Sequence, residues 1–206
     1  MNKRLKLFVG ICCIVSLFSL AACTLDESSV VSAGGNSTYE SSEVKSSMVE
    51  RVNLIEVTSP DGKIKASIPE GWTEDNLDNP DASIQLSNEE EFGYTLIVIE
   101  DKADYDTSTK LADYQKIILD SMVDTLGGTE AVKKSEPESI KVNNYQAIQC
   151  DLEGFFEGTS VKYLITCIDA QDHYLQVVSW SYPGKFDSNK DDFNTVLNSI
   201  KLTSEQ

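Results

Sequence analysis

The chain has 206 residues, of which 17 are basic and 34 acidic, giving a formal net charge of −17. Because 3 of the basic residues and none of the acidic ones precede Cys23, the chain from Cys23 onward carries −20. Such a surface repels nucleic-acid phosphates and anionic lipid headgroups, which argues against nucleic-acid binding and electrostatic attachment to membranes. Solubility is the ordinary role of this charge, while cationic partners and divalent metals stay open.

The amino-terminal segment combines a basic start, a short apolar run and a cysteine. The apolar run, residues 7–20, is shorter than the ~20 residues that a membrane-spanning helix needs. It ends in Leu20-Ala21-Ala22-Cys23, which resembles the lipobox of bacterial lipoproteins, with cleavage between Ala22 and Cys23 and lipidation of the Cys23 thiol. We therefore expect residues 1–22 to be a signal peptide and acyl chains on Cys23 to anchor the chain extracytoplasmically. The alternative is an ordinary signal peptide in which Cys23 is incidental.

The segment after Cys23 is predicted to be a tether. Residues 24–50 contain eight serines, the pair Gly34-Gly35 and no sustained apolar period. Such a segment cannot bury enough apolar surface to fold. Residues 23–50 are thus expected to be a flexible, acidic linker, and residues 51–206 have the length of one globular domain.

The first part of this domain is predicted to contain two antiparallel hairpins. Residues 54–57 and 64–68 have strand-like sequences, and they flank Asp61-Gly62, which is a strong hairpin signal. Residues 82–86 and 94–100 form the second expected pair.

Two helices are predicted. Apolar side chains recur at helical spacing over residues 110–126, and Gly127-Gly128 follow, so we expect a helix that ends there. A closing helix is expected to begin near Ser188, whose spacing from Asp191 resembles a capping box, and to present an apolar face up to Ile200.

The strand expected near residue 175 is apolar on both of its faces, which is typical of a strand covered on both sides. With one helix in the middle of the domain and another at its end, the predicted fold class is α+β, a central and mostly antiparallel sheet sandwiched between helices. The strands expected between the two helices are residues 139–142, 145–152, 160–169 and 173–182.

Three short motifs support this architecture by resemblance. They are Ile68-Pro69-Glu70-Gly71-Trp72 after the opening hairpin, the strand sequence of residues 174–180, and Asn198-Ser199-Ile200-Lys201 at the end of the closing helix. These motifs resemble the PsbP-like fold, which is shared by the photosystem extrinsic protein PsbP, a Ran-binding nucleotide-release factor and many bacterial lipoproteins. The resemblance covers about residues 51–203 and implies an α/β/α sandwich, but it transfers no partner-binding residue.

Catalytic constellations are scarce in this chain. It has one histidine, His173, and no Gly-x-Ser-x-Gly or His-Glu-x-x-His motif, so no catalytic residue is assigned. A dyad of Cys167 and His173 would require a three-residue loop between their strands, because a two-residue loop places the two side chains on opposite faces. A second functional hypothesis is a small hydrolase or transferase that uses paired carboxylates of the acidic loops.

Two acidic segments present oxygen ligands of the kind that calcium prefers, and a calcium-dependent adhesin or sensor is the third hypothesis. Neither segment fits the EF-hand pattern, so no metal ligand and no cofactor is assigned. Three aromatic residues are expected to be core rather than the wall of a pocket. The acidic residues are Asp75, Asp78 and Asp81, with Asp101, Asp104 and Asp106, and the aromatic ones are Trp72, Tyr174 and Trp180.

Cys150 and Cys167 are expected on consecutive strands. A type II′ turn at Gly158-Thr159 would pair Glu157 with Ser160 and place the two cysteines directly opposite each other, within reach of a disulfide. An extracytoplasmic location permits oxidation, so the sequence predicts a cross-strand contact and a possible disulfide. The alternatives are two buried free thiols, or a longer loop from Gly154 that shifts the register by one.

The leading hypothesis is therefore a lipid-anchored, non-catalytic module of the cell envelope. Its expected partners are the membrane, through the lipid, and an envelope protein or peptide, with no nucleic acid.

Overall fold

The structure, a computed structural model, describes residues 53–203. The predicted cleavage at Ala22, the lipidation of Cys23 and the tether lie outside the described residues, so they stay predictions. Within residues 53–203, no helix has the length and apolar character needed to cross a bilayer.

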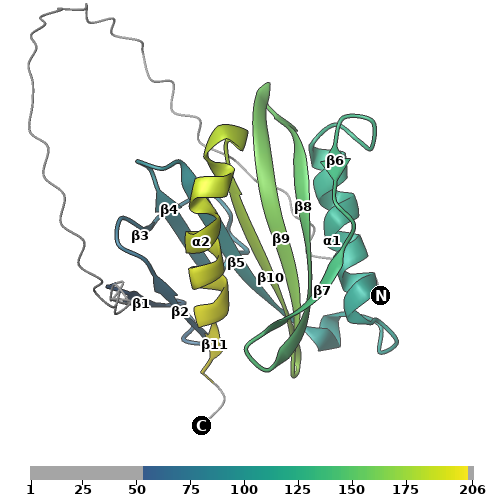
Figure 1. Cartoon of the computed structure of the whole chain (residues 1–206). Coiled ribbons are helices and arrows are strands. Elements are labelled where there is room, and N and C mark those ends of the chain that lie inside the picture. The colour runs from purple at the N-terminus through teal and green to yellow at the C-terminus, as the bar shows by residue number, and fades with distance from the viewer. Residues whose placement is uncertain (1–52, 204–206) are drawn as a thin grey trace, which may run out of the picture. The chain divides into compact units, whose positions relative to one another are not determined.

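An eight-stranded antiparallel sheet forms the centre of the described domain (Figure 1). Its strands run in the order β3-β4-β5-β10-β9-β8-β6, and β7 also pairs with β8. The strands are β3 (Thr73–Glu74), β4 (Ile84–Asn88), β5 (Gly93–Asp101), β6 (Lys133–Lys134), β7 (Glu138–Val142), β8 (Tyr145–Phe156), β9 (Thr159–Ala170) and β10 (His173–Ser181).

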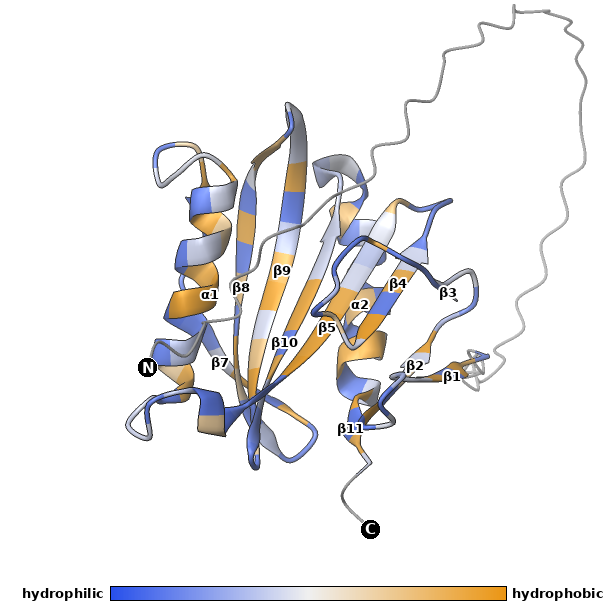
Figure 2. Cartoon of the chain, turned by 180° about the vertical axis from the view of Figure 1, so that it is seen from behind, coloured by the Kyte–Doolittle hydropathy of each residue, from blue (hydrophilic) through white to orange (hydrophobic). Residues whose placement is uncertain are grey.

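The central strands β5, β9 and β10 are apolar over long stretches (Figure 2), because both of their faces are buried. In β10, Tyr174, Val178 and Trp180 belong to one core layer, whereas Leu175 and Val177 belong to the other. The predicted covering of this strand on both sides is therefore confirmed.

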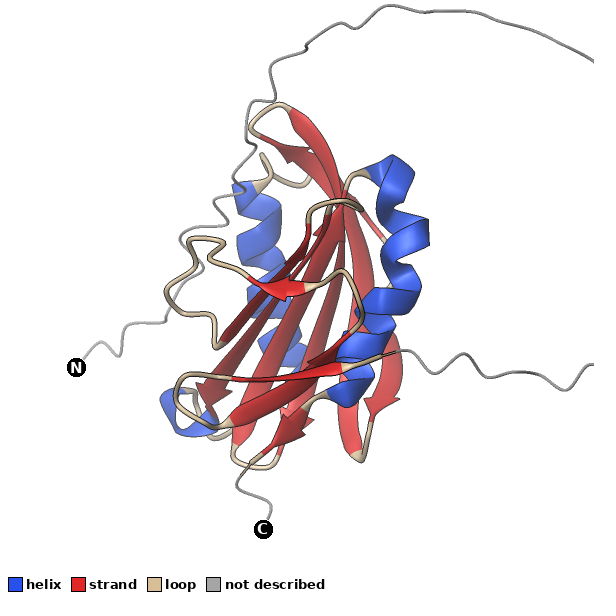
Figure 3. Cartoon of the chain, turned by 90° about the vertical axis from the view of Figure 1, so that its left-hand side faces the viewer, coloured by secondary structure: helices blue, strands red, loops and turns tan. Residues whose placement is uncertain are grey.

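One helix covers each face of the sheet (Figure 3). The helix α1 (Leu111–Thr125) buries Tyr114, Ile118 and Met122 in one layer, and α2 (Pro183–Ser199) buries Phe186 and Phe193 in the other. A single 3₁₀ turn, η1 (Lys102–Asp104), leads from β5 toward α1. This arrangement confirms the predicted α+β sandwich, and α1 lies within one residue of its predicted ends.

A separate three-stranded sheet joins the two ends of the domain. The strands β1 (Ile55–Thr58) and β2 (Ile64–Ile68) form the predicted hairpin, and β11 (Lys201–Leu202) pairs with the free side of β2. The buried face of β2 packs in the α2 layer. The hydroxyl of Ser199 accepts a hydrogen bond of 2.7 Å from the Ser67 amide, which connects the end of α2 to this sheet.

The predicted start of the closing helix is wrong. The helix α2 begins at Pro183, five residues before Ser188. A proline fits the first position of a helix because its φ is preset and its missing N–H would have no helical partner there. Ser188 lies inside the helix, where its hydroxyl donates to the Lys185 carbonyl over 2.8 Å, so it is no capping residue.

The predicted register of the β8–β9 hairpin is also wrong. The turn is centred on Glu157 and Gly158, with φ of 49° and 83°, and it joins a Phe156–Thr159 pair. Positive φ at both central residues defines a type I′ turn, in which glycine occupies the second central position rather than the first. Each pairing is consequently shifted by two residues relative to the prediction.

This shift removes the geometry on which the disulfide prediction depended. Cys150 pairs with Ile165, and Cys167 pairs with Ile148, so the two cysteines are diagonal neighbours on one face. Diagonal positions lie about 7–8 Å apart, beyond the usual Cα separation of a disulfide. Both thiols are free and buried in the α1 layer, which corresponds to the alternative of two packed cysteines.

Candidate functional site

A pocket lies at the edge of the central sheet, where β8 changes its partner strand. There β7 pairs with residues 145–149 of β8, and β6 pairs with Leu152 and Glu153. Between these pairings, the Ser135 amide donates to the Asp151 carbonyl over 3.0 Å, and the Asp151 amide donates to the Ser135 hydroxyl over 2.9 Å. The pocket has a volume of about 220 Å³. Its lining, polar except for one leucine, consists of Lys133, Lys134, Ser135, Asp151, Leu152, Glu153 and Lys162.

Glu153 is the central carboxylate of this pocket. It pairs with Lys162 on the β9 side and with Lys133 on the β6 side, and paired residues project from the same face of the sheet. Its Oε1 lies 3.4 Å from the Nζ of Lys133, while no ion pair to Lys162 forms. The Glu153 carboxylate therefore lies between two lysines, and it is within strong hydrogen-bond distance of neither.

Lys162 is half-buried, with 26% of its side chain exposed. Its Nζ lies 3.5 Å from Asp151 Oδ2, 4.0 Å from Asp187 Oδ1 and 4.3 Å from the ring centroid of Phe186. The two carboxylate distances exceed those of an N–H···O hydrogen bond. Because Phe186 and Asp187 belong to α2, the first turns of that helix flank the pocket.

The groups available in the pocket suit the recognition of a charged ligand. The hydroxyl of Ser135 is engaged with the Asp151 amide and lies 3.4 Å from the Glu136 carbonyl to which it donates. The single histidine of the chain is not among the lining residues.

The structure separates Cys167 from His173. His173 pairs with Ala170 across the two-residue turn of Gln171 and Asp172, so the two candidate residues project from opposite faces of the sheet. Cys167 is fully buried under α1, and its burial, together with the nearby Cys150 and Glu100, raises the pKa of its thiol far above the ordinary value. The two-residue loop thus rules out this dyad.

The two acidic segments form local turns. Asp101 accepts a hydrogen bond of 2.8 Å from the Ala103 amide at the start of η1, and Asp106 accepts bonds from the amide and hydroxyl of Ser108. Asp75 accepts one from the Asn76 amide over 2.7 Å. Among residues 53–203, no three Asp, Glu, His or Cys side chains gather as a metal site would require.

The three aromatic candidates are core residues, as predicted. Trp72 lies in the α2 layer, where its Nε1 donates to Asp192 over 2.9 Å and its ring contacts Phe193 edge-on. Tyr174 and Trp180 lie in the α1 layer. Since the sheet separates these layers, the three rings do not share a pocket.

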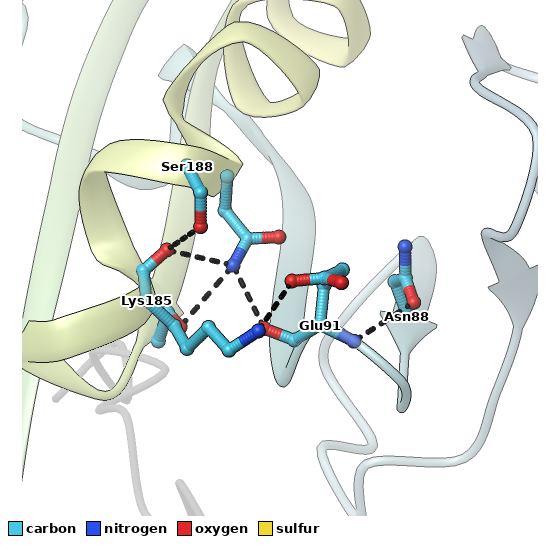
Figure 4. A network of polar contacts seen from close by, with 6 residues as sticks. Asn88, Glu91, Lys185 and Ser188 are labelled. Carbon is cyan, nitrogen blue, oxygen red and sulfur yellow. Dashed lines mark hydrogen bonds and ion pairs between the residues drawn. The ribbon is translucent and has the colours of Figure 1, made fainter. Parts of the chain in front are cut away.

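A polar network fixes the start of α2 beside the pocket (Figure 4). The buried Asn189 amide donates to the Glu91 carbonyl over 2.8 Å and to the Lys185 carbonyl over 2.9 Å. Lys185 forms an ion pair of 2.7 Å with Glu91. Gly93 is required here, because a Cβ at this position would lie 2.6 Å from the Asn189 Oδ1.

Neither the pocket nor this network is predicted from the sequence. The only sequence signal of the pocket is the adjacent pair Lys133-Lys134 in a strongly acidic chain, and a pair of lysines ordinarily indicates a solvated loop. The convergence of these residues with Glu153 and Lys162 depends on strand pairing.

No family model and no curated protein sequence matches this chain. Solved structures do match it. The cyanobacterial PsbP protein CyanoP from Synechocystis sp. PCC 6803 is 12% identical, with a TM-score of 0.54 over 75% of this chain and 95% of that one. The Saccharomyces cerevisiae Ran-binding protein Mog1p is 10% identical, with a TM-score of 0.55 over 73% and 96%. LpqN, involved in cell envelope biogenesis of Mycobacterium tuberculosis, is 11% identical, with a TM-score of 0.53 over 75% and 92%.

At such low identity these likenesses concern the fold alone. The described domain has the PsbP-like fold, and the resemblance inferred from the three sequence motifs is confirmed at this level.

Proposed function

We propose that this chain, whose described domain has the PsbP-like fold, is a lipoprotein anchored through Cys23 to the extracytoplasmic face of a bacterial cell membrane. The observation that carries this proposal is the order of a basic start, a short apolar run and Leu20-Ala21-Ala22-Cys23. Two or more acyl chains anchor stably, and the strongly acidic chain needs such an anchor because it has no electrostatic attraction to anionic lipids. As a coil, the tether of residues 23–50 reaches roughly 30 Å, which keeps the domain near the membrane.

We further propose that the domain is a non-catalytic binding module for an envelope protein or peptide. Support comes from the pocket beside Ser135, which offers charged groups, and from Mog1p, a Ran-binding protein with the same fold. LpqN, which is involved in cell envelope biogenesis, has the same fold, and this supports a role at the envelope. The pocket carboxylates Asp151 and Glu153 are each paired with a lysine, at 3.5 Å and 3.4 Å.

The anchor is tested by replacing Cys23. Wild type is expected to partition into the detergent phase and to incorporate labelled palmitate, whereas Cys23→Ser is released or stays unprocessed. Cys13→Ser is the matched control, because it changes a cysteine of the same segment that is expected to leave with the signal peptide. Recovery of wild type as an unacylated, soluble chain would end the proposal of an anchor. Turnover of ester, peptide or glycoside substrates by purified protein would contradict the non-catalytic role.

A further inference from the structure

We propose that the pocket beside Ser135 is the recognition site of this module, and that it binds a carboxylate of an acidic peptide segment between Lys133 and Lys162. The carboxylate takes the position that Glu153 partly fills, and an apolar side chain of the same segment lies on Phe155. The proposal rests on the proposed role as a binding module, but it is independent of the lipid anchor.

The first observation is a set of unused hydrogen-bond donors. A lysine ammonium has three N–H donors, yet the Nζ of Lys162 forms no hydrogen bond to any residue in the range 53–203, and Lys133 forms one of 3.4 Å. Several lysines elsewhere in the domain are held more closely, as in the pairs Lys65–Glu56 at 2.6 Å and Lys185–Glu91 at 2.7 Å. The half-buried Lys162 has less access to water than those exposed lysines. An acceptor group of a ligand can therefore bond the N–H donors that no protein group bonds.

The second observation is the place of Glu153. Its strand neighbours on the two sides are Lys133 and Lys162, so the protein itself puts a carboxylate between two ammonium groups. The contact to Lys133 is long and no ion pair to Lys162 forms, which leaves this internal carboxylate weakly held. An incoming carboxylate of the same chemistry can therefore compete with Glu153 for both lysines.

The third observation is an exposed aromatic ring next to the pocket. Phe155 is 60% exposed, the most exposed of the four large apolar side chains that are exposed in residues 53–203. It lies two residues beyond Glu153 on β8 and pairs with Ser160, so it projects from the same face about 7 Å farther along the strand. An aromatic ring beside a charged pocket fits a peptide that carries an apolar and an acidic side chain.

The local charge at this site is less negative than that of the whole chain. The Debye length is about 8 Å at physiological salt, so distant carboxylates are largely screened while the lysines that line the pocket are not. The lining contains three lysines against two carboxylates, and Asp187 of α2, 4.0 Å from the Nζ of Lys162, balances the third lysine.

The test uses the full chain in detergent micelles, with amide chemical shifts as the readout. The probe is N-acetyl-Phe-Glu-amide, and the matched neutral probe is N-acetyl-Phe-Gln-amide. We expect saturable shifts at residues 133–135 and 151–155, with an affinity about tenfold higher for the Glu peptide than for the Gln peptide, as one charged hydrogen bond provides. Lys162→Met keeps the aliphatic stem over Phe186 and should weaken binding of the Glu peptide about fivefold, since screening reduces part of the effect.

Two further variants make the test directional. Lys133→Gln, at an exposed position, should also weaken binding, whereas Glu153→Gln should strengthen it because the competing internal carboxylate is lost. Lys116→Gln, which changes an exposed charge on α1 outside the pocket lining, should leave the affinity unchanged. If Lys162→Met fails to fold, the opposite effects of Lys133→Gln and Glu153→Gln still decide.

Equal affinity for the Glu and Gln peptides, or weaker binding by Glu153→Gln, would overturn the proposal. Inorganic phosphate that binds more tightly than the Glu peptide would instead assign the pocket to phosphate and overturn the carboxylate assignment. A negative result here leaves the membrane fractionation of Cys23→Ser unaffected, so failure of the pocket and failure of the anchor are distinguishable.

Discussion

Asn189 is the residue that ties α2 to the central sheet. Its buried amide donates to carbonyls of the β4–β5 turn and of α2 itself, and Gly93 leaves the space that it occupies. The amide of Asn189 is buried and its two carbonyl partners are part-buried, and loss of such hydrogen bonds costs about 1–3 kcal/mol for each group left without a partner. We predict that Asn189→Ala lowers the free energy of unfolding by about 2–4 kcal/mol, measured by urea denaturation.

Lys185→Ala provides the matched comparison. It removes the short but exposed ion pair with Glu91, and such pairs contribute about 0–1 kcal/mol. A loss as large as that of Asn189→Ala would mean that the ion pair, and not the buried amide, holds the helix to the turn.

The two buried thiols make stability depend on alkaline pH. Burial raises the pKa of the Cys150 thiol to about 11, and burial raises the pKa of the Cys167 thiol still further. In the unfolded chain both thiols ionise near pH ~8.5, so above this pH the unfolded state binds fewer protons than the folded state. We predict that the free energy of unfolding falls as pH rises from 8.5 toward 11, by up to about 1.4 kcal/mol per pH unit for each thiol.

Unfolding by urea at pH 8 and pH 10 measures this dependence. The double variant Cys150→Ala, Cys167→Ala should be less stable at pH 8, because it leaves small cavities, but its stability should fall less between the two pH values. A parallel fall in the variant and the wild type would assign the effect to other groups.

At the scale of the element, the β8–β9 turn holds Glu157 in a strained backbone conformation that a substitution can relieve. Glu157 has a φ of 49°, in the left-handed region that Asn tolerates far better than Glu, and Asn-Gly is the preferred pair of a type I′ turn. We predict that Glu157→Asn raises the free energy of unfolding by about 0.5–1 kcal/mol. Glu130→Asn, which removes the same charge at an exposed residue without a positive φ, should change it by less than about 0.5 kcal/mol. Destabilisation by Glu157→Asn would argue against this turn.

The same turn shows why the sequence predicts some elements and not others. The apolar period of α1 and the double-faced pattern of β10 extend over many residues, so their prediction succeeds. A register depends on where one glycine sits, and Gly158 suits the first position of a type II′ turn as well as the second of a type I′ turn. Likewise, predicting the start of α2 requires a choice between Pro183 and the capping pattern at Ser188. The pocket depends on the two-residue strand β6, which is too short to show any period.

At the scale of the whole molecule, the fold class follows from the sequence, whereas the neighbours in the sheet do not. That β10 must be covered on both sides is visible in its residues. Tertiary packing decides that β5 lies beside β10, some 80 positions later in the chain, and that β11 joins β2. The candidate site cannot be predicted from the sequence for the same reason, since it combines β6, β8, β9 and α2.

The pairing of β11 with β2 gives a prediction for the whole domain. Leu202 is buried, and the Thr203 amide donates to the Lys63 carbonyl over 2.9 Å. Truncation after Ile200 removes these contacts and exposes one edge of β2, so we predict a loss of about 2–4 kcal/mol in the free energy of unfolding, about the value of one buried leucine with its hydrogen bonds. Truncation after Thr203 is the control and should leave thermal denaturation unchanged. Equal stability of both truncated chains would show that β11 is dispensable.

The joining of β2 to β11 also sets the order of events during synthesis. Lys65 meets Lys201 only after nearly the entire domain has been made, so the small sheet cannot close on a growing chain, and pairings of such long sequence separation form slowly. Strands β2 and β11 therefore pair late, after all residues of the central sheet are available.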